Sequence, residues 1–382
     1  MKITSNIYSL KNMFFLESYK LFYVFLILLL FSCNTITNNP NDSNDQNCMP
    51  NVSVKKNSFK NYVEKEFGKT PETEGMVLIK GGEFEMGSDN NQAKQDEFPK
   101  HKVFVNSFWM DITEVTNNKF QKFIDQTGYI TTAERPIDWN EIKKILPPGT
   151  PKPHDSLMAP ASLVFLQTQA YNLNDHSQWW ILKKNANWKQ PLGDKSNIIG
   201  KGDHPVVHIS WEDALAYCKW AGKRLPTEAE FEYASRGGLK NNTYSWGNEP
   251  VFEGKTKANI WEGKFPSQNT VSDKYYYTAP VGSFPPNSYG LYDIGGNVWE
   301  WCSDWYSSNY YSENYPNVSN NPKGPMKSYD PIEPFTPKKV MRGGSFLCND
   351  SYCSGYRNSM RMKSSPDSSL IHAGFRTVVD VK

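Results

Sequence analysis

Apolar residues in the segment 116–128 recur at the spacing of one helix face. Thr116 is suited to the N-cap position, because its hydroxyl can accept a hydrogen bond from a free backbone N–H of the first turn. Gly128 can end the helix in a left-handed conformation. The residues that share the apolar face are Phe120, Phe123 and Ile124.

Two capping-box patterns predict two further helices. Ser210 with Asp213 marks the start of a helix that we expect to end at Gly222. Thr227 with Glu230 marks the start of the next. The sequence thus predicts three short helices with defined starts, two of which also have a predicted end.

Short apolar runs predict strands elsewhere. MVLIKGGEFEMG, residues 76–87, is typical of two short strands around the turn at Gly81 and Gly82. The β pattern continues in HKVFVNSFWM, residues 101–110, and VVHI, residues 206–209, also predicts a strand.

Between these regions, proline clusters and Asn/Asp/Gly runs in residues 129–200 favour a long irregular excursion. We expect three tryptophans to pin it to the body: Trp179, Trp180 and Trp188.

The N-terminus has the pattern of an export signal. Basic residues precede LFYVFLILLLF, residues 21–31, an apolar run shorter than the roughly 20 residues of a spanning helix. Ser32-Cys33 at its end resembles a lipobox, although an ordinary signal peptide with an incidental cysteine remains the alternative. We predict a lipoprotein signal peptide over 1–32, with Cys33 as the lipidated residue of a protein anchored to a bacterial membrane, facing the periplasm or cell surface.

The segment after Cys33 is rich in Asn, Asp, Ser and Pro and poor in apolar residues. Such a composition cannot bury enough surface to fold, so residues 33–72 are predicted to be a disordered tether. The folded domain is predicted over 73–382.

Composition narrows the fold and the partners. The chain has 42 basic and 40 acidic residues, a formal net charge of +2, and no dense basic block, which excludes a nucleic-acid binder. Its 12 Trp, 21 Tyr, 21 Phe, 25 Gly and 25 Pro residues favour an irregular, loop-rich fold knitted by aromatic side chains over a helical bundle.

Two cysteines lie in the loop-like run RGGSFLCNDSYCSGYR, residues 342–357. Cys348 and Cys353 can converge if the chain turns back, since Asn, Asp and Ser form turns. Two thiolates are too few for a structural zinc site. They suit Cu(I), which accepts few ligands, but the same geometry permits a disulfide, which spacing alone favours in an exported protein.

The motifs YGLYDIGGNVWEWCSDWY, RGGSFLCNDSYCSGYRNSM and AGFRTVVD resemble those of the sulfatase-modifying factor family, whose best-known members are formylglycine-generating enzymes. The resemblance extends over roughly residues 75–382. It implies an α+β fold distantly similar to C-type lectins, an irregular, loop-rich single domain with little regular secondary structure. Many members share these scaffold motifs without oxidase activity, and the cysteine pair separates the two groups.

The resemblance implies a copper-dependent oxidase. With O2, such an enzyme converts a cysteine in a C-x-P-x-R-like segment of an unfolded sulfatase polypeptide to Cα-formylglycine. Cys348 and Cys353 would hold Cu(I), Ser345 would face the oxygen pocket, Trp299 would line it, and Tyr352 would donate a hydrogen bond near the metal. Core packing is the alternative for Trp299 and Tyr352. The alternative function is a non-catalytic scaffold or binding lipoprotein of the gliding or surface-assembly type.

The resemblance also implies two structural calcium sites, for which Ca²⁺ would take side-chain and backbone carbonyl oxygens. The first set is Asn259, Ile260, Asp273 and Tyr275, and the second is Asp293, Gly296, Val298 and Glu300. Arg342 and Arg376 are interpreted as scaffold ion-pair residues.

Several positions depart from the family pattern. Vertebrate members carry disulfides where this chain has Cys218 opposite Thr377, and Ser235 opposite Asn358. Members tend to have Asn before the final LGFR-like run, where this chain has His372. We therefore expect a different substrate contact there.

Overall fold

The structure, a computed structural model, describes residues 70–143, 149–170 and 172–381. The predicted signal peptide, Cys33 and nearly all of the predicted tether lie outside these residues. In the described part of the chain, no helix is both long and apolar enough to cross a membrane.

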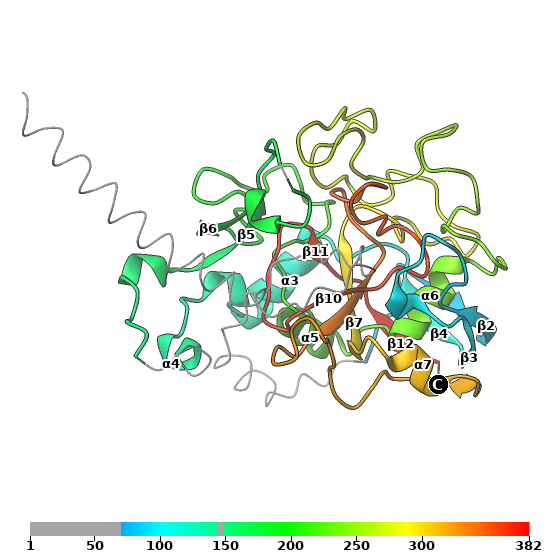
Figure 1. The fold of residues 1–382 in the computed structure, drawn as a ribbon. Coiled ribbons are helices and arrows are strands. Elements are labelled where there is room, and N and C mark those ends of the chain that lie inside the picture. The colour runs from blue at the N-terminus through cyan, green and yellow to red at the C-terminus, as the bar shows by residue number, and fades with distance from the viewer. Residues whose placement is uncertain (1–69, 144–148, 171, 382) are drawn as a thin grey trace, which may run out of the picture. The chain divides into compact units, whose positions relative to one another are not determined.

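Short helices and strands are separated by long loops (Figure 1). The helices are α3 (Asn117–Thr127), α4 (Trp139–Ile142), α5 (Trp211–Ala221), α6 (Glu228–Arg236) and α7 (Tyr310–Asn314). The strands are β1 (Met76–Ile79), β2 (Gly82–Met86), β3 (His101–Val105), β4 (Phe108–Asp111), β5 (Ala161–Phe165), β6 (Trp180–Lys184), β7 (Trp299–Trp305), β8 (Ser319–Asn320), β9 (Lys339–Arg342), β10 (Met362–Ser364), β11 (Ala373–Gly374) and β12 (Val378–Asp380). Four 3₁₀ turns complete the regular structure of the described residues: Gln95–Glu97, Thr132–Glu134, Asp155–Leu157 and His176–Gln178.

The three predicted helices are confirmed, together with their predicted starts and, for the first two, their predicted ends. The Thr116 hydroxyl accepts a hydrogen bond from Lys119 N–H at the start of α3, and Gly128 ends the helix with φ of 65°. The predicted capping boxes are both formed, at the starts of α5 and α6. Local capping chemistry was therefore enough to place these helices.

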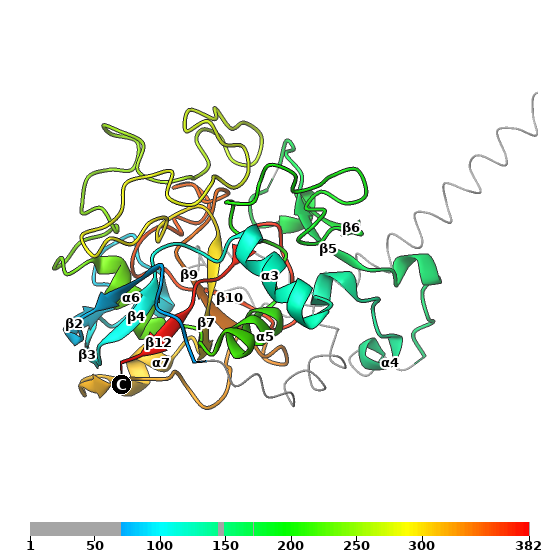
Figure 2. The same cartoon turned by 180° about the vertical axis from the view of Figure 1, so that it is seen from behind.

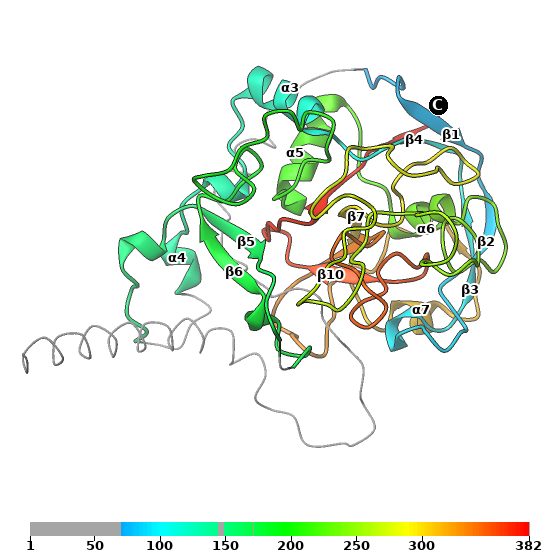
Figure 3. The same cartoon turned by 90° about the horizontal axis from the view of Figure 1, so that it is seen from above.

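A four-stranded sheet in the order β10-β9-β7-β11 lies at the centre of the larger unit of the chain, with α5 and α6 on opposite sides of β7 (Figures 1 and 3). Strand β7 pairs antiparallel with β9 and parallel with β11. The other sheets are β1-β4-β12, β2-β3-β8 and β5-β6. Helices α3 and α5 pack side by side (Figure 2).

The two strands predicted in residues 76–87 are present as β1 and β2, but they belong to different sheets. The chain passes between them at Gly81, where an added Cβ would lie 2.4 Å from the Val105 carbonyl oxygen. Only a residue without a side chain permits this close approach.

Two sequence-based predictions were wrong. Residues 129–200 are not wholly irregular, since β5 and β6 pair within them. Residues 206–209 do not form a strand, because His208 has φ of 59° and breaks the extended backbone. The prediction for the tryptophans is confirmed: Trp179, Trp180 and Trp188 are buried in the larger core cluster.

By its contacts the chain divides into two units. The larger comprises residues 46–330 and 336–382 and carries every helix and strand described above. The described residues of the smaller unit, 331–335, form only bends and a turn.

Candidate active site

The loop after β9 is closed by glycines. Gly343 and Gly344 both have positive φ, 92° and 81°. A Cβ on Gly344 would lie 2.6 Å from the Tyr356 backbone nitrogen, so the outgoing chain packs directly on the returning chain. Gly344 of the RGGS motif thus lets the two ends of the cysteine loop come together.

Asn349 turns the chain between the two cysteines. Its carbonyl oxygen accepts hydrogen bonds from the N–H groups of Tyr352 (3.0 Å), Cys353 (2.9 Å) and Ser354 (3.0 Å). Its side-chain Oδ1 accepts from Ser351 N–H at 2.9 Å. The turn predicted from the Asn, Asp and Ser residues is therefore present between the two cysteines.

Both thiols are buried, and neither is part of a disulfide. Cys348 and Cys353 have 1% and 5% of their surface exposed, and all four cysteines of the described residues are unbridged. Burial raises the pKa of Tyr356 well above its usual value, and the Asp350 carboxylate and both of these thiols add to the rise. The two sulfurs therefore lie within electrostatic range of the same phenol.

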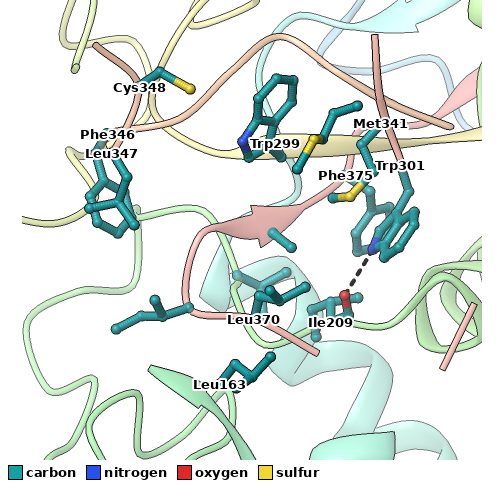
Figure 4. Packing of buried hydrophobic residues seen from close by; sticks show 14 of the residues in the cluster. Leu163, Ile209, Trp299, Trp301, Met341, Phe346, Leu347, Cys348, Leu370 and Phe375 are labelled. Carbon is teal, nitrogen blue, oxygen red and sulfur yellow. Dashed lines mark hydrogen bonds between the residues drawn. The ribbon is translucent and has the colours of Figure 1, made fainter. Parts of the chain in front are cut away.

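Ser345 contacts Cys348, and Trp299 lies close by. The Ser345 N–H donates to Cys348 Sγ at 3.4 Å, and the Ser345 hydroxyl lies 3.9 Å from the same sulfur. The Cys348 sulfur is directed toward the Trp299 indole (Figure 4). Gly355 lies against both groups, since an added Cβ would be 2.5 Å from Trp299 Cζ2 and 2.6 Å from Cys348 Sγ.

Tyr352 belongs to an aromatic cluster beside the loop. Its ring stacks on Phe265 with centroids 4.2 Å apart and meets the Trp179 ring edge-on at 5.6 Å. These contacts support the interpretation that Tyr352 packs in the core. Its role as a hydrogen-bond donor near a metal stays a prediction.

An open cavity lies next to the cysteine loop. It has a volume of about 470 Å³, and Asn349 contributes to its wall together with Ile260 and Glu262. Neither cysteine is among its lining residues. A bound peptide would reach the thiols only if the side chains that bury them moved aside.

The first predicted calcium set contains two buried oxygens without a hydrogen-bond partner among the described residues. Asn259 and Asp273 are buried, and in the described residues Asn259 Oδ1 and Asp273 Oδ2 have no hydrogen-bond partner. Burial raises the pKa of Asp273 to about 6. A buried acceptor without a donor is costly, so these oxygens fit a cation.

The second predicted set gathers buried negative charge. Asp293 and Glu300 lie near each other, and burial raises the pKa of Asp293 to about 6. Sequence reasoning missed Glu114, which is fully buried and close enough to both carboxylates for them to raise its pKa further. Its place in the motif DITEVTN was the signal that could have identified it.

Arg376 offsets only part of this charge. Its guanidinium pairs with Glu300 at 2.7 Å and lies 4.0 Å from Glu114. Asp293 Oδ1 and Glu114 Oε2 have no hydrogen-bond partner among the described residues. No three His, Cys, Asp or Glu side chains of that part of the chain form a closed metal site, so a cation would also need carbonyl oxygens.

The two arginines interpreted as scaffold residues form buried ion pairs. Arg342 pairs with Glu228 at 3.1 Å and with Glu232, and thereby joins β9 to α6. Arg376 joins β7 to the segment before β12 through Glu300.

The positions that depart from the family pattern have specific partners. Where vertebrate members are expected to carry a disulfide, the Ser235 hydroxyl donates to Asn358 Oδ1 at 2.6 Å. Thr377 donates instead to the Asp111 carboxylate, and Cys218 is buried as a small apolar residue. His372 has 2% of its surface exposed, and its ring contacts Ser345.

Known proteins are similar to the chain over most of its length. A family model described as "Sulfatase-modifying factor enzyme 1-like domain" matches residues 62–381. The chain is 44% identical over 306 residues to the formylglycine-generating enzyme of Mus musculus, which covers 80% of the chain and 75% of that protein. It is 36% identical over 308 residues to the inactive Cα-formylglycine-generating enzyme 2 of Bos taurus, covering 80% of the chain and 88% of that protein.

Among solved structures, PvdO from Pseudomonas aeruginosa is similar in fold. The TM-score is 0.53 at 23% identity, covering 82% of the chain and all of that protein, 100%. This likeness supports the predicted loop-rich α+β fold.

Proposed function

The chain belongs to the sulfatase-modifying factor family, and we propose that it is a copper-dependent oxidase that generates formylglycine in a sulfatase. The observation that carries this proposal is a pair of buried thiols outside any disulfide, Cys348 and Cys353. Asn349 turns the chain between them, and Ser345 donates to the Cys348 sulfur. The substrate class is an unfolded polypeptide with a C-x-P-x-R-like segment.

The donor chemistry fits Cu(I). Two thiolates are soft ligands, and a monovalent copper ion accepts a low coordination number. Such an ion, with O2, would supply the removal of hydrogen from an unactivated carbon, which no side chain is basic enough to accomplish. Overall, the substrate sulfur leaves as sulfide, one oxygen atom enters the aldehyde and the other becomes water, and an external reductant supplies the electrons that this balance requires.

The chain's own residues would bind the copper ion and would orient and shield the reacting thiols. The Asn349 turn would set the spacing of the two sulfurs, and Gly355 lets the Trp299 indole and the Cys348 sulfur both pack against it. The buried indole would exclude water from one side of the reacting thiols, which strengthens electrostatic interactions there. The Ser345 N–H and hydroxyl would donate to the Cys348 sulfur.

Both calcium sites belong to this proposal as structural supports. Asn259 and Asp273, with the carbonyls of Ile260 and Tyr275, would hold the first ion. Asp293, Glu300 and the carbonyls of Gly296 and Val298 would hold the second, and Glu114 adds charge beside it.

Export and lipid anchoring through Cys33 complete the proposal, since a tethered enzyme near a membrane could meet its client during export.

A non-catalytic binding protein is the second candidate function. An inactive relative is 36% identical to this chain, so the shared fold does not by itself establish catalysis. The near-complete burial of both thiols also favours this alternative, because a substrate must reach them. The two functions differ in one measurable product, the aldehyde.

The test is incubation of a peptide containing C-x-P-x-R with the Cu(I)-loaded protein, O2 and a reductant, followed by mass spectrometry. We expect conversion of the peptide cysteine to an aldehyde that a hydrazine probe captures. Cys348→Ser and Cys353→Ser should each abolish conversion, at least 100-fold, whereas the matched control Cys218→Ala changes a buried thiol outside the site and should retain it. An unchanged peptide with folded, copper-loaded wild-type protein would exclude the oxidase.

A further inference from the structure

His372 is held beside the cysteine loop by the central sheet. It directly precedes β11, and its carbonyl oxygen accepts a hydrogen bond from the Trp299 N–H at 2.8 Å. Strand β11 continues the contact, because Ala373 pairs with Trp299 in parallel register. The backbone therefore fixes His372 next to one of the residues expected to line the reaction pocket.

The His372 ring contacts Ser345 within this buried region. Its Nδ1 lies 3.2 Å from Ser345 Oγ, and neither residue has more than 2% of its surface exposed. On the other side, the ring meets the edge of the Trp180 indole with centroids 4.8 Å apart. In the described part of the chain, His372 Nε2 has no hydrogen-bond partner.

The Ser345 hydroxyl has one proton and two acceptor lone pairs to distribute. The Leu347 N–H donates to Ser345 Oγ at 3.3 Å and uses one lone pair. If His372 Nδ1–H donates to the other, the serine proton is free to point at the Cys348 sulfur, 3.9 Å away. If Nδ1 instead accepts that proton, the sulfur loses the hydroxyl donor and keeps the Ser345 backbone N–H at 3.4 Å.

The surroundings favour the first arrangement. Burial lowers the pKa of His372 to about 3, so the ring is neutral and carries a single N–H. A buried N–H without an acceptor is rarer and costlier than a bare acceptor. Since Nε2 has no acceptor among the described residues, the proton belongs on Nδ1, where Ser345 can accept it.

We propose that His372 is a positioning residue that donates from Nδ1 to Ser345 and thereby directs the serine hydroxyl proton onto the Cys348 sulfur. This proposal rests on the proposed copper chemistry of the cysteine pair. Donors to a metal-bound thiolate stabilise its negative charge in a buried site, and losing such an outer partner typically costs about 10- to 100-fold in metal affinity or activity.

Two variants at position 372 separate the hydrogen bond from packing. His372→Leu fills a similar volume without a donor, whereas the amide N–H of His372→Asn can reach the position of Nδ1. Cu(I) affinity is measured without oxygen or peptide, by competition with a chromophoric chelator, and thermal unfolding confirms that each variant is folded. The matched control is His204→Leu, because His204 contacts Thr278 and not the cysteine loop.

We expect His372→Leu to weaken Cu(I) binding at least 10-fold and His372→Asn to restore it to within about threefold of wild type. Ser345→Ala should have a similar effect, and the double variant Ser345→Ala/His372→Leu should be no weaker than either single variant, because both act on one hydrogen bond. The proposal would be overturned if wild type and His372→Leu bound Cu(I) with equal affinity, or if His372→Asn bound it as weakly as His372→Leu. It would also be overturned if the losses of affinity of the two single variants multiplied in the double variant. Failure of wild-type protein to bind Cu(I) would instead refute the proposed function.

Discussion

At the scale of single residues, the candidate site depends on two positions without side chains. Gly344 lets the ends of the cysteine loop touch, and Gly355 lets Trp299 and Cys348 approach each other. These contacts could not be predicted from the sequence, because a glycine in a loop does not reveal what packs against it. The turn at Asn349, by contrast, could be predicted from its residue types, because the hydrogen bonds that form it are local.

Replacing Gly355 with Ala should damage the site more than the fold. The new methyl group would lie within 2.6 Å of both the Trp299 ring and Cys348 Sγ, so one of them must move. We expect at least a 10-fold loss of aldehyde formation with a stability loss of about 1–3 kcal/mol, measured by peptide turnover and denaturant unfolding.

The matched control is Gly128→Ala, at the end of α3. It should cost about 1 kcal/mol, because Gly128 has φ of 65° but nothing within 4 Å of an added Cβ, and turnover should be unchanged. Gly355→Ala with wild-type turnover would show that close contact between Trp299 and Cys348 is unnecessary.

At the scale of elements, helices were predictable where their ends are set by neighbouring residues, as at Thr116 and Gly128. Strand partners were not, because pairing depends on contacts far apart in sequence. Thus β1 and β2 are close along the chain but pair with β4 and β3. The strand predicted over residues 206–209 does not form, because His208 has a left-handed backbone. The pattern of apolar residues does not indicate backbone handedness, so it could not have revealed this.

The loops around β7 gather carboxylates that lack enough positive partners, so calcium should stabilise the protein at neutral pH. Burial raises the pKa values of Asp273 and Asp293 to about 6. Each carboxyl therefore binds more protons in the folded than in the unfolded chain between its ordinary value and pH 6. Without cations, these groups destabilise the fold above pH 6, and that penalty is lost as the pH falls toward 4.

We expect a calcium chelator to lower Tm at pH 7 by roughly 5 °C, since saturating a site at 100 times its Kd contributes about 2.7 kcal/mol and each kcal/mol shifts Tm by about 2 °C. The decrease in Tm caused by the chelator should be smaller at pH 5. Asp293→Asn, which removes one buried charge, should raise the Tm of the chelated protein at pH 7 and reduce the calcium effect. A Tm that does not respond to chelator at either pH would contradict both calcium sites.

At the scale of the whole molecule, composition and motifs predicted a loop-rich α+β fold, and the described residues have that fold. The predicted ligand sets were carried by motif resemblance, while Glu114 and the contact between His372 and Ser345 required three-dimensional information. Both involve residues more than 25 positions apart from their partners, which no local pattern connects.

The central claim is that Cys348 and Cys353 together bind one Cu(I) ion. Copper K-edge X-ray absorption on protein loaded with one equivalent of Cu(I) tests it directly by counting the sulfur neighbours of the metal. We predict two sulfur neighbours in the wild-type protein and loss of one in both Cys348→Ser and Cys353→Ser, with no change in Cys218→Ala. Copper bound only through nitrogen or oxygen, or a sulfur count that survives both serine variants, would contradict the claim.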